Sequence, residues 1–302
     1  MDKPIIAGIA VVRNEQDIIE PFVRHNLKFL DRLLVMDNGS VDATKHILSQ
    51  LRDEFPQLYL SHDNRFSDDL AGRANLLLRQ CDAQFAVPLD ADEFISANSR
   101  EEYAEMLSTI PVGGYANVPW QTFVVHKGKE LEAAVNPPWT IRYYRVIEAP
   151  QFSKVIVRLD GLGARYLCLF TGSHEVSARS GKALPSIDLP MKLLHYPVRS
   201  YEQMIGKCSI SWMSYCAHNP DARATLQNYH KREIYDAIVS GEKIDLSKLS
   251  MLYAQSERTI DWNHDVMEYP VAFDYVRKYS TGDPMSAVQL IMKSWERWMG
   301  ER

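Results

Sequence analysis

The chain has 302 residues, of which 46% are hydrophobic and 24% are charged, and its formal net charge is -5. These values are typical of a globular protein with a sizeable buried core. The acidic balance excludes the broad basic surface that nucleic-acid binding requires, so any phosphate must be bound by a few local groups. The cysteines form no Cys-x-x-Cys pair, which argues against a zinc site and against a disulfide framework.

The start of the chain lacks the charged, apolar and small-residue zones of a secretion signal. No apolar run approaches the roughly 18 residues that are needed to span a bilayer. We therefore expect a cytoplasmic protein. The length exceeds that of a usual single domain but not that of two, which predicts one large domain with an appendage.

The first hundred residues alternate between short apolar runs and amphipathic segments. This pattern predicts strands at 5–12, 33–36, 58–60 and 85–89, separated by helices at 17–30, after Ser40 as a helix cap, and at 68–80. Strands that alternate with helices of this length form a parallel sheet covered on both faces. Ligands of such sheets bind at the carboxyl ends of the strands.

Short polar segments follow each of the four predicted strands. They are Arg13-Asn14-Glu15, Asp37-Asn38, Asp63-Asn64-Arg65 and Asp90-Ala91-Asp92. Because parallel strands end at one edge of a sheet, we expect these segments to lie together. Two aspartates one residue apart supply hard oxygen ligands that hold a divalent cation against a diphosphate. The competing interpretation is that polar residues simply end strands.

Four blocks in a fixed order resemble those of a family 2 glycosyltransferase with the GT-A fold. They are Val12-Arg13-Asn14-Glu15, Asp37-Asn38-Gly39-Ser40-Val41-Asp42, Ala71-Gly72-Arg73-Ala74-Asn75 and Leu89-Asp90-Ala91-Asp92-Glu93. The resemblance continues more loosely through Phe152-Ser153-Lys154-Val155-Ile156, Gly172-Ser173-His174-Glu175 and His195-Tyr196-Pro197, which are similar to a bacterial branch of that family. It implies a GT-A domain at 1–200, with a Rossmann-like, mostly parallel sheet and helices on both faces, and a helical C-terminal extension at 201–302.

The resemblance also implies a nucleoside-diphosphate sugar, UDP-linked as the first choice, as the donor substrate. The residues that match its binding segments are Arg13, Asn14, Glu15, Asp37 and Asn38. Arg73 matches a basic position whose guanidinium would hold the diphosphate through a forked contact.

A metal site of Mn²⁺ or Mg²⁺ is implied at the aspartate pair. Asp92 would ligate the cation directly, and Asp90 would face the ribose or a metal-bound water. His195 is a candidate further ligand because imidazole suits Mn²⁺, although a structural histidine is the equal alternative.

An inverting transfer needs a general base that takes the proton from the acceptor hydroxyl. The candidates by position are Glu175, His174 and Asp188, none of which lies in the acidic pair that the family usually carries there. The identity of the base and the stereochemistry therefore stay open.

The remaining segments are less informative. Residues 114–157 are predicted to be extended, and Trp120 in a predicted loop offers either a sugar-stacking surface or core packing. The apolar stripe of the last predicted helix, 284–299, indicates core packing or subunit contact, with peripheral membrane contact as the alternative.

The sequence thus predicts a metal-dependent glycosyltransferase that moves a sugar from a nucleoside-diphosphate sugar to a hydroxyl of a carbohydrate or glycoconjugate. Two alternatives stay open: an Asp-x-Asp phosphohydrolase, and a non-catalytic protein that binds a sugar or nucleotide.

Overall fold

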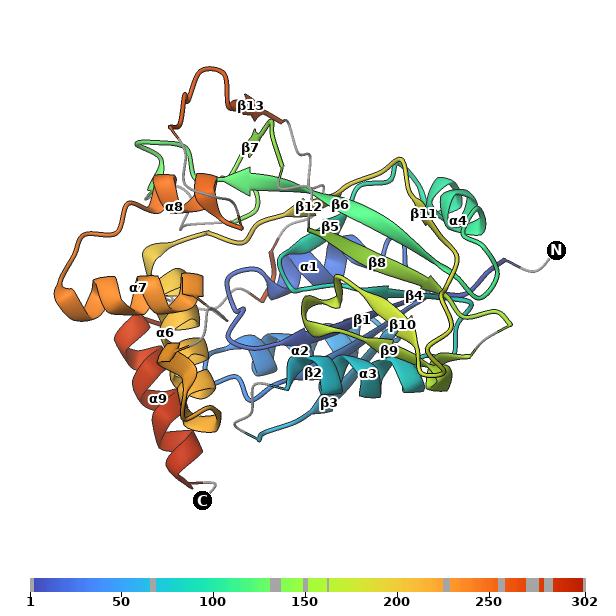
Figure 1. Cartoon of the computed structure of the whole chain (residues 1–302), viewed down its shortest axis with the longest axis horizontal. Coiled ribbons are helices and arrows are strands. Elements are labelled where there is room, and N and C mark those ends of the chain that lie inside the picture. Colours follow the sequence, from blue (N-terminus) through green and yellow to red (C-terminus); the bar gives the residue numbers. More distant parts are fainter. Residues whose placement is uncertain are drawn as a thin grey trace.

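The computed structural model describes most of the chain. The described residues are 3–65, 69–130, 137–148, 152–161, 163–224, 229–254, 259–269, 277–279 and 285–300. They form a layered α/β structure in which a twisted sheet runs through the centre (Figure 1).

The N-terminal half supplies four parallel strands in the order β4-β1-β2-β3. Their bounds are β1 (Ile6–Val12), β2 (Arg32–Asp37), β3 (Leu58–His62) and β4 (Phe85–Pro88), and the helices between them are α1 (Ile19–Asn26), α2 (Thr44–Glu54) and α3 (Leu70–Gln80). All four predicted strands and the three predicted helices are confirmed. Because the strands are parallel, their carboxyl ends lie at one edge of the sheet.

Helices cover both faces of this parallel region. Ile6 and Val12 of β1 pack in one hydrophobic core with α1 and α2, whereas Ala7 and Ile9 pack in a second core with α3. Successive side chains of a strand point to opposite faces, which explains why a nearly continuous apolar strand is buried on both sides. The predicted α/β fold class with helices on both faces is confirmed.

The second half of the sheet is largely antiparallel. β8 (Ser153–Arg158) joins β4, and the sheet continues through β6 (Tyr115–Val124), β7 (Tyr143–Arg145) and β13 (Val266–Glu268). Three short strands add to it, β5 (Glu93–Ile95), β11 (Ser186–Asp188) and β12 (Leu193–His195), and β9 (Leu167–Leu169) with β10 (Val176–Ala178) forms a separate hairpin. Trp120 lies in β6 and is buried, so its predicted position in a loop is wrong.

Two predicted helix starts or ends differ from the structure. α1 ends at Asn26, whose buried side chain donates to the carbonyl of Glu93 (3.0 Å) and accepts from the N–H of Ile95 (3.0 Å), which fixes β5. Ser40 does not cap α2; its hydroxyl instead accepts from the N–H of Asn14 (2.9 Å). Both side chains bind neighbouring backbone segments, an option that Asn and Ser have at any loop.

Past residue 200 the described structure is mainly helical, as predicted. The helices are α6 (Tyr201–His218), α7 (Tyr229–Ser240), α8 (Leu246–Leu252) and α9 (Ala287–Gly300), and α4 (Arg100–Ser108) lies earlier in the chain. α6, α7 and α9 stand on the left in Figure 1, next to the carboxyl ends of the parallel strands. Among the described residues, no helix combines the length and apolar character that crossing a membrane requires.

Candidate active site

Two adjoining hollows lie where the parallel strands end. The first is lined by Arg13, Asn14, Gln203, Gly206, Lys207, Ile210, Ser211 and Leu290. The second is lined by Arg13, Asn38, Gly39, Asn64, Arg65, Ile210, Ser294, Arg297 and Trp298. Because Arg13 and Ile210 border both, we treat the two hollows as one groove. The segments after β1, β2 and β3 thus meet at one edge, as predicted.

Two asparagines on this edge carry buried amide groups with unused hydrogen-bonding atoms. Asn14 has a positive φ of 58° and its Oδ1 accepts from the N–H of Val41 (2.8 Å). Its Nδ2 and both side-chain atoms of Asn38, which is 3% exposed, have no hydrogen-bond partner within the described structure. A buried polar group without a partner costs about 1–3 kcal/mol, so such atoms indicate a place for a ligand or water.

Asp92 lies at the centre of a buried ionic cluster that we define as Glu15, Asp17, Asp92, Arg199 and Lys207. Its side chain is 4% exposed and lies 3.2 Å from Lys207 Nζ and 3.5 Å from Arg199 Nη1. Burial alone raises the pKa of Asp92, but the two cations outweigh it and hold the pKa below its usual range. Asp92 is therefore an anion at neutral pH.

Arg199 connects the loop after β1 to the segment between β12 and α6. Its guanidinium donates to Asp17 through Nε (2.6 Å) and Nη2 (3.0 Å), and Nη2 also donates to Glu15. The side chain is fully buried. Burial raises the pKa of Glu15 to about 7 despite the nearby Lys207 and Arg199.

Asp90 points the other way from Asp92 and belongs to a second group. It is 53% exposed and pairs with the buried Lys154 Nζ at 2.8 Å, and Lys154 also lies 3.3 Å from Glu93. Glu93 accepts from the indole N–H of Trp120 (2.7 Å). Burial raises the pKa of Glu93 to about 8.

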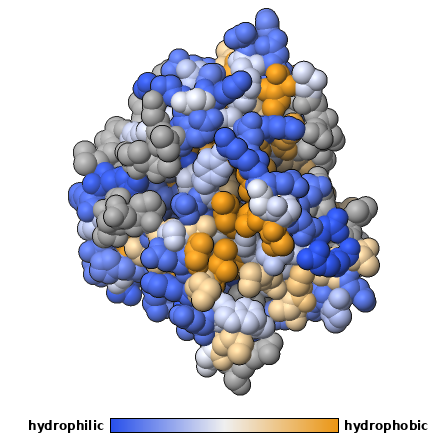
Figure 2. Space-filling view, turned by 90° about the vertical axis from the view of Figure 1, so that its left-hand side faces the viewer, coloured by the Kyte–Doolittle hydropathy of each residue, from blue (hydrophilic) through white to orange (hydrophobic). Residues whose placement is uncertain are grey.

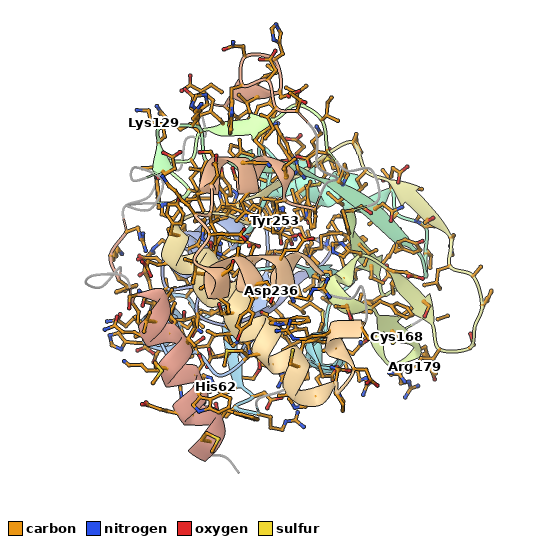
Figure 3. All side chains as sticks on the ribbon, turned by 60° about the vertical axis from the view of Figure 1, so that its left-hand side comes forward. His62, Lys129, Cys168, Arg179, Asp236 and Tyr253 are labelled. Atoms are coloured by element: carbon orange, nitrogen blue, oxygen red, sulfur yellow. The ribbon has the colours of Figure 1, made fainter. Side chains whose placement is uncertain are left out.

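His195 lies near Asp92 because β12 pairs with β5. In this pairing His195 is opposite Glu93, the residue directly after Asp92. Its Nε2 lies 3.8 Å from Asp92 Oδ1, and the ring stacks on Trp120 with centroids 4.2 Å apart. Burial lowers the pKa of His195 to about 3, so the imidazole is neutral, the form that ligates metals. Tyr253, labelled in Figure 3, packs edge-on against the ring (5.6 Å).

The predicted metal ligands therefore fit a cation only in part. His195 Nε2 lies 3.8 Å from Asp92 Oδ1, but cations already contact both carboxylates of the pair: Lys207 and Arg199 contact Asp92, and Lys154 contacts Asp90. Within the described residues, no group of three or more His, Cys, Asp or Glu side chains could hold a metal ion. Divalent cations in phosphate sites commonly take one or two protein ligands and complete their shell with substrate oxygens.

The three predicted bases lie in different places. His174 lies beside Trp120 (centroids 5.2 Å apart) and its Nδ1 hydrogen-bonds the carbonyl of Ser153 (2.9 Å). Burial lowers the pKa of His174 below its usual value. Glu175 is exposed next to it. Asp188 is exposed on β11 and accepts from Asn117 (3.1 Å), outside the ionic cluster and the groove.

Two residues that were predicted to bind the donor instead form contacts within the protein. Arg73 is buried in α3 and donates to Asp63 (3.0 Å) and to the carbonyl of Arg65 (2.9 Å), so it organises the loop after β3. Asp37 is buried at the end of β2, accepts from the N–H of Ser40 (3.2 Å), and lies 3.8 Å from Nδ1 of His62, which Figure 3 labels. Neither residue is among those lining the groove.

Sequence reasoning missed the three buried or half-buried cations. Lys154 begins the apolar run Lys154-Val155-Ile156-Val157, and a lysine in a buried strand was a usable signal. Lys207 lies on the same face of α6 as Met204 and Cys208, which is likewise unusual for a surface lysine. Arg199 carries no local signal, because its partners are distant in sequence.

Residues 9–156 match the model of glycosyl transferase family 2. Comparison with curated proteins gave no match.

Similar solved structures include the mannosyltransferase PcManGT from Pyrobaculum calidifontis in complex with GDP-Man and Mn²⁺, with 16% identity, TM-score 0.45, and coverage of 84% of this chain and 80% of that chain. Another is S. aureus TarS 1–349, with 15% identity, TM-score 0.42, and coverage of 76% of this chain and 69% of that chain. GalNAc-T7 with UDP, GalNAc and Mn²⁺ has 12% identity, TM-score 0.42, and coverage of 83% of this chain and 56% of that chain. On the family match, the chain carries a domain of glycosyl transferase family 2 and is a glycosyltransferase.

Proposed function

We propose that this glycosyltransferase uses a nucleoside-diphosphate sugar, UDP-linked as the first candidate, and transfers the sugar to a hydroxyl of a carbohydrate or glycoconjugate. The observation that carries the proposal is the groove at the strand ends. Its walls bring together Arg13, the unpaired Nδ2 of Asn14, the unpaired side-chain amide of Asn38, and Lys207 next to Asp92.

Arg13 and Lys207 are suited to the diphosphate. The side chain of Lys207 is 40% exposed at the groove while its Nζ contacts Asp92 and Glu15. Burial lowers the pKa of Lys207, but the two carboxylates outweigh it and raise the pKa above the usual range, so the ammonium stays charged. A fixed cation beside the departing diphosphate stabilises the charge that develops on it.

Asp92 and His195 are the residues that would hold a divalent cation, Mn²⁺ or Mg²⁺, with Asp90 as a weaker candidate. When bound, the cation would act as a Lewis acid toward the diphosphate. Arg199 fixes the Asp92 carboxylate, and Trp120 fixes the His195 ring, so both side chains are positioned in advance.

His174 and Glu175 are the remaining base candidates near the site. The contact from His174 Nδ1 to the Ser153 carbonyl requires a proton on Nδ1, which leaves the Nε2 lone pair available. With its lowered pKa, the neutral ring can accept the proton of an acceptor hydroxyl. Asp188 is the least suited of the predicted three, because it is exposed on β11 and bonded by Asn117, whereas His174 packs against Trp120, which stacks on His195.

A thermal-shift panel of UDP-, GDP-, CDP- and ADP-linked sugars, each with and without Mn²⁺, tests the proposal. A ligand present at one hundred times its Kd stabilises the native state by about 2.7 kcal/mol, which raises Tm by several degrees. We expect one nucleoside class to give the shift, and only with the cation.

Asp92→Asn supplies the matched variant, because the amide keeps the size of the side chain. It should stay folded, lose the Mn²⁺-dependent shift and lose release of the nucleoside diphosphate during transfer. Asp82→Asn, on a residue whose side chain is 93% exposed, should behave as wild type. The proposal fails if no nucleotide sugar shifts Tm, or if Asp92→Asn retains full turnover.

A further inference from the structure

Helix α9, the last helix of the chain, forms one wall of the groove. Ser294, Arg297 and Trp298 line the second hollow together with Asn38 and Asn64. This helix lies more than a hundred residues beyond the segment that matches the family model. It is therefore an element of the site that neither the family match nor the sequence patterns assign.

Specific contacts place α9 against the strand ends. Arg297 Nη1 donates to the carbonyl of Ser40 (3.1 Å), in the loop after β2. A Cβ added at Gly39 would lie 3.6 Å from Arg297 Nε, which is an ordinary van der Waals distance, so the Arg297 side chain lies directly over this loop. Leu290, on the same face of α9, packs toward α6, where a Cβ added at Gly206 would lie 3.0 Å from its Cδ1.

Unused polar atoms from two different elements line the second hollow. The Ser294 hydroxyl, on a residue that is 7% exposed, has no hydrogen-bond partner in the described structure, and neither has the side chain of Asn38, which lines the same hollow. An amide offers one acceptor and two donors, and a hydroxyl offers a donor and an acceptor. Together they match a ligand part that is polar but uncharged and has several donors and acceptors, as a nucleobase or a ribose has.

The two ends of the groove differ in chemistry. The first hollow has Arg13 and Lys207 and adjoins Asp92, so it suits the diphosphate. The second is bordered by Asn38 and Ser294, and the ring of Trp298 supplies an apolar surface. A ligand that lies along the groove would place its charged part in the first hollow and its neutral polar part in the second.

We propose that α9 forms a wall of the nucleoside subsite, with Ser294 and Asn38 hydrogen-bonding the nucleoside and with Arg297 and Trp298 covering it. This inference rests on the proposed nucleotide-sugar donor and adds that the C-terminal helix takes part in selecting it. The nucleoside preference then depends on residues outside the family segment.

The face of helix α9 that lies away from the groove offers a position for a control variant. This face carries the exposed side chains Val288, Met292, Trp295 and Met299. Figure 2 shows hydrophobic side chains gathered on the side of the molecule where α7 and α9 lie. Met292 is 54% exposed and outside the groove, so Met292→Ala changes the helix without touching the proposed subsite.

The test measures binding to the full-length chain with Mn²⁺. UDP, GDP, CDP and ADP are titrated by calorimetry and by tryptophan fluorescence, with inorganic pyrophosphate as the probe that lacks a nucleoside. We expect Ser294→Ala to weaken the tightest nucleoside diphosphate about 5- to 10-fold, the effect of one lost hydrogen bond. Because the hydroxyl has no partner, its removal should not lower Tm without ligand.

Ser294→Leu, which fills the hollow, should weaken that nucleoside diphosphate more than Ser294→Ala does. Both variants should bind pyrophosphate as wild type does, and Met292→Ala should bind every probe normally. The inference is overturned if both Ser294 variants bind the nucleoside diphosphate with wild-type affinity, or if they weaken pyrophosphate equally. If the wild-type chain binds none of the four nucleotides, the proposed function fails and the inference with it, a result that is distinct from the first two.

Discussion

Arg199 holds three carboxylates of the ionic cluster in place, and its removal gives the sharpest test of how the site is built. The fully buried guanidinium contacts Asp17, Glu15 and Asp92, and its Nη1 also donates to the carbonyl of Tyr196 (3.1 Å). In Arg199→Met, Glu15 and Asp92 would keep Lys207 as a neighbouring cation, Asp17 would lose its two contacts with the guanidinium, and the Tyr196 carbonyl would lose this donor.

Removing one member of a buried ion pair costs about 3–5 kcal/mol, because the remaining charge stays buried without compensation. Methionine conserves much of the arginine volume, so a cavity adds little. We therefore expect the free energy of unfolding of Arg199→Met to fall by about 3–5 kcal/mol. With a urea slope of about 3 kcal/mol per M, the midpoint should fall by about 1–1.7 M.

Urea unfolding followed by circular dichroism measures this change, and two further variants separate charge from geometry. Arg199→Lys keeps the charge but loses the forked contact with Asp17, so we expect a smaller loss of about 1–3 kcal/mol. Arg32→Met removes a surface pair with the exposed Asp82 and should cost under about 1 kcal/mol. A loss below about 1 kcal/mol for Arg199→Met would refute the argument, because the carboxylates would then be held by other groups.

Two further predictions concern the scaffold around the site. Arg24 hydrogen-bonds Glu54 and lowers the pKa of Glu54 to about 2, with help from Tyr279 and Lys278. A lowered carboxyl pKa adds stability at pH values above about 4.5, and this stability is lost as the pH falls toward 2. The free energy of unfolding of Glu54→Gln should therefore be about 2 kcal/mol lower than that of wild type at pH 7. Urea titrations should show this difference shrinking below pH 4. The side chain of Asn75 joins α3 to β9 by donating to the carbonyl of Leu169 (2.8 Å) and accepting from its N–H (2.9 Å). Asn75→Ala should cost about 2–4 kcal/mol and speed proteolysis between β9 and β10, and unchanged cleavage would show that the hairpin is held by other contacts.

The strand ends could be predicted from the sequence because the information is local. Apolar runs, helical spacing and short polar segments after each run are read within ten to fifteen residues, and together they place Arg13, Asn38 and Asn64 on one edge. The prediction that differs from the structure concerns a side chain with more than one hydrogen-bond partner nearby. Ser40 looked like a helix cap, but its hydroxyl binds Asn14 instead, since a serine in a loop has several backbone partners within reach.

The charges around Asp92 could not be predicted in the same way. Arg199 is 182 residues from Asp17 in sequence, and the contact exists only because β12 pairs with β5 and starts the turn into α6. The resemblance supplied the carboxylates at 90 and 92 but not the cations that hold them. The two aspartates, one buried and one exposed, are held by different cations, and the buried Glu93 accepts from the N–H of Asp90 and lies 3.3 Å from Lys154.

The C-terminal helices contribute to the groove as well as the strand ends. A boundary near residue 200 describes where the secondary structure changes, but the groove takes Lys207 from α6 and Arg297 from α9. The contact between Arg297 and Ser40 joins residues 257 positions apart. A chain ending at residue 200 would lack one of the cations on Asp92 and one wall of each hollow. The strand ends supply polar groups and the helices supply the surface that encloses them, so the donor site that we propose belongs to both parts of the chain.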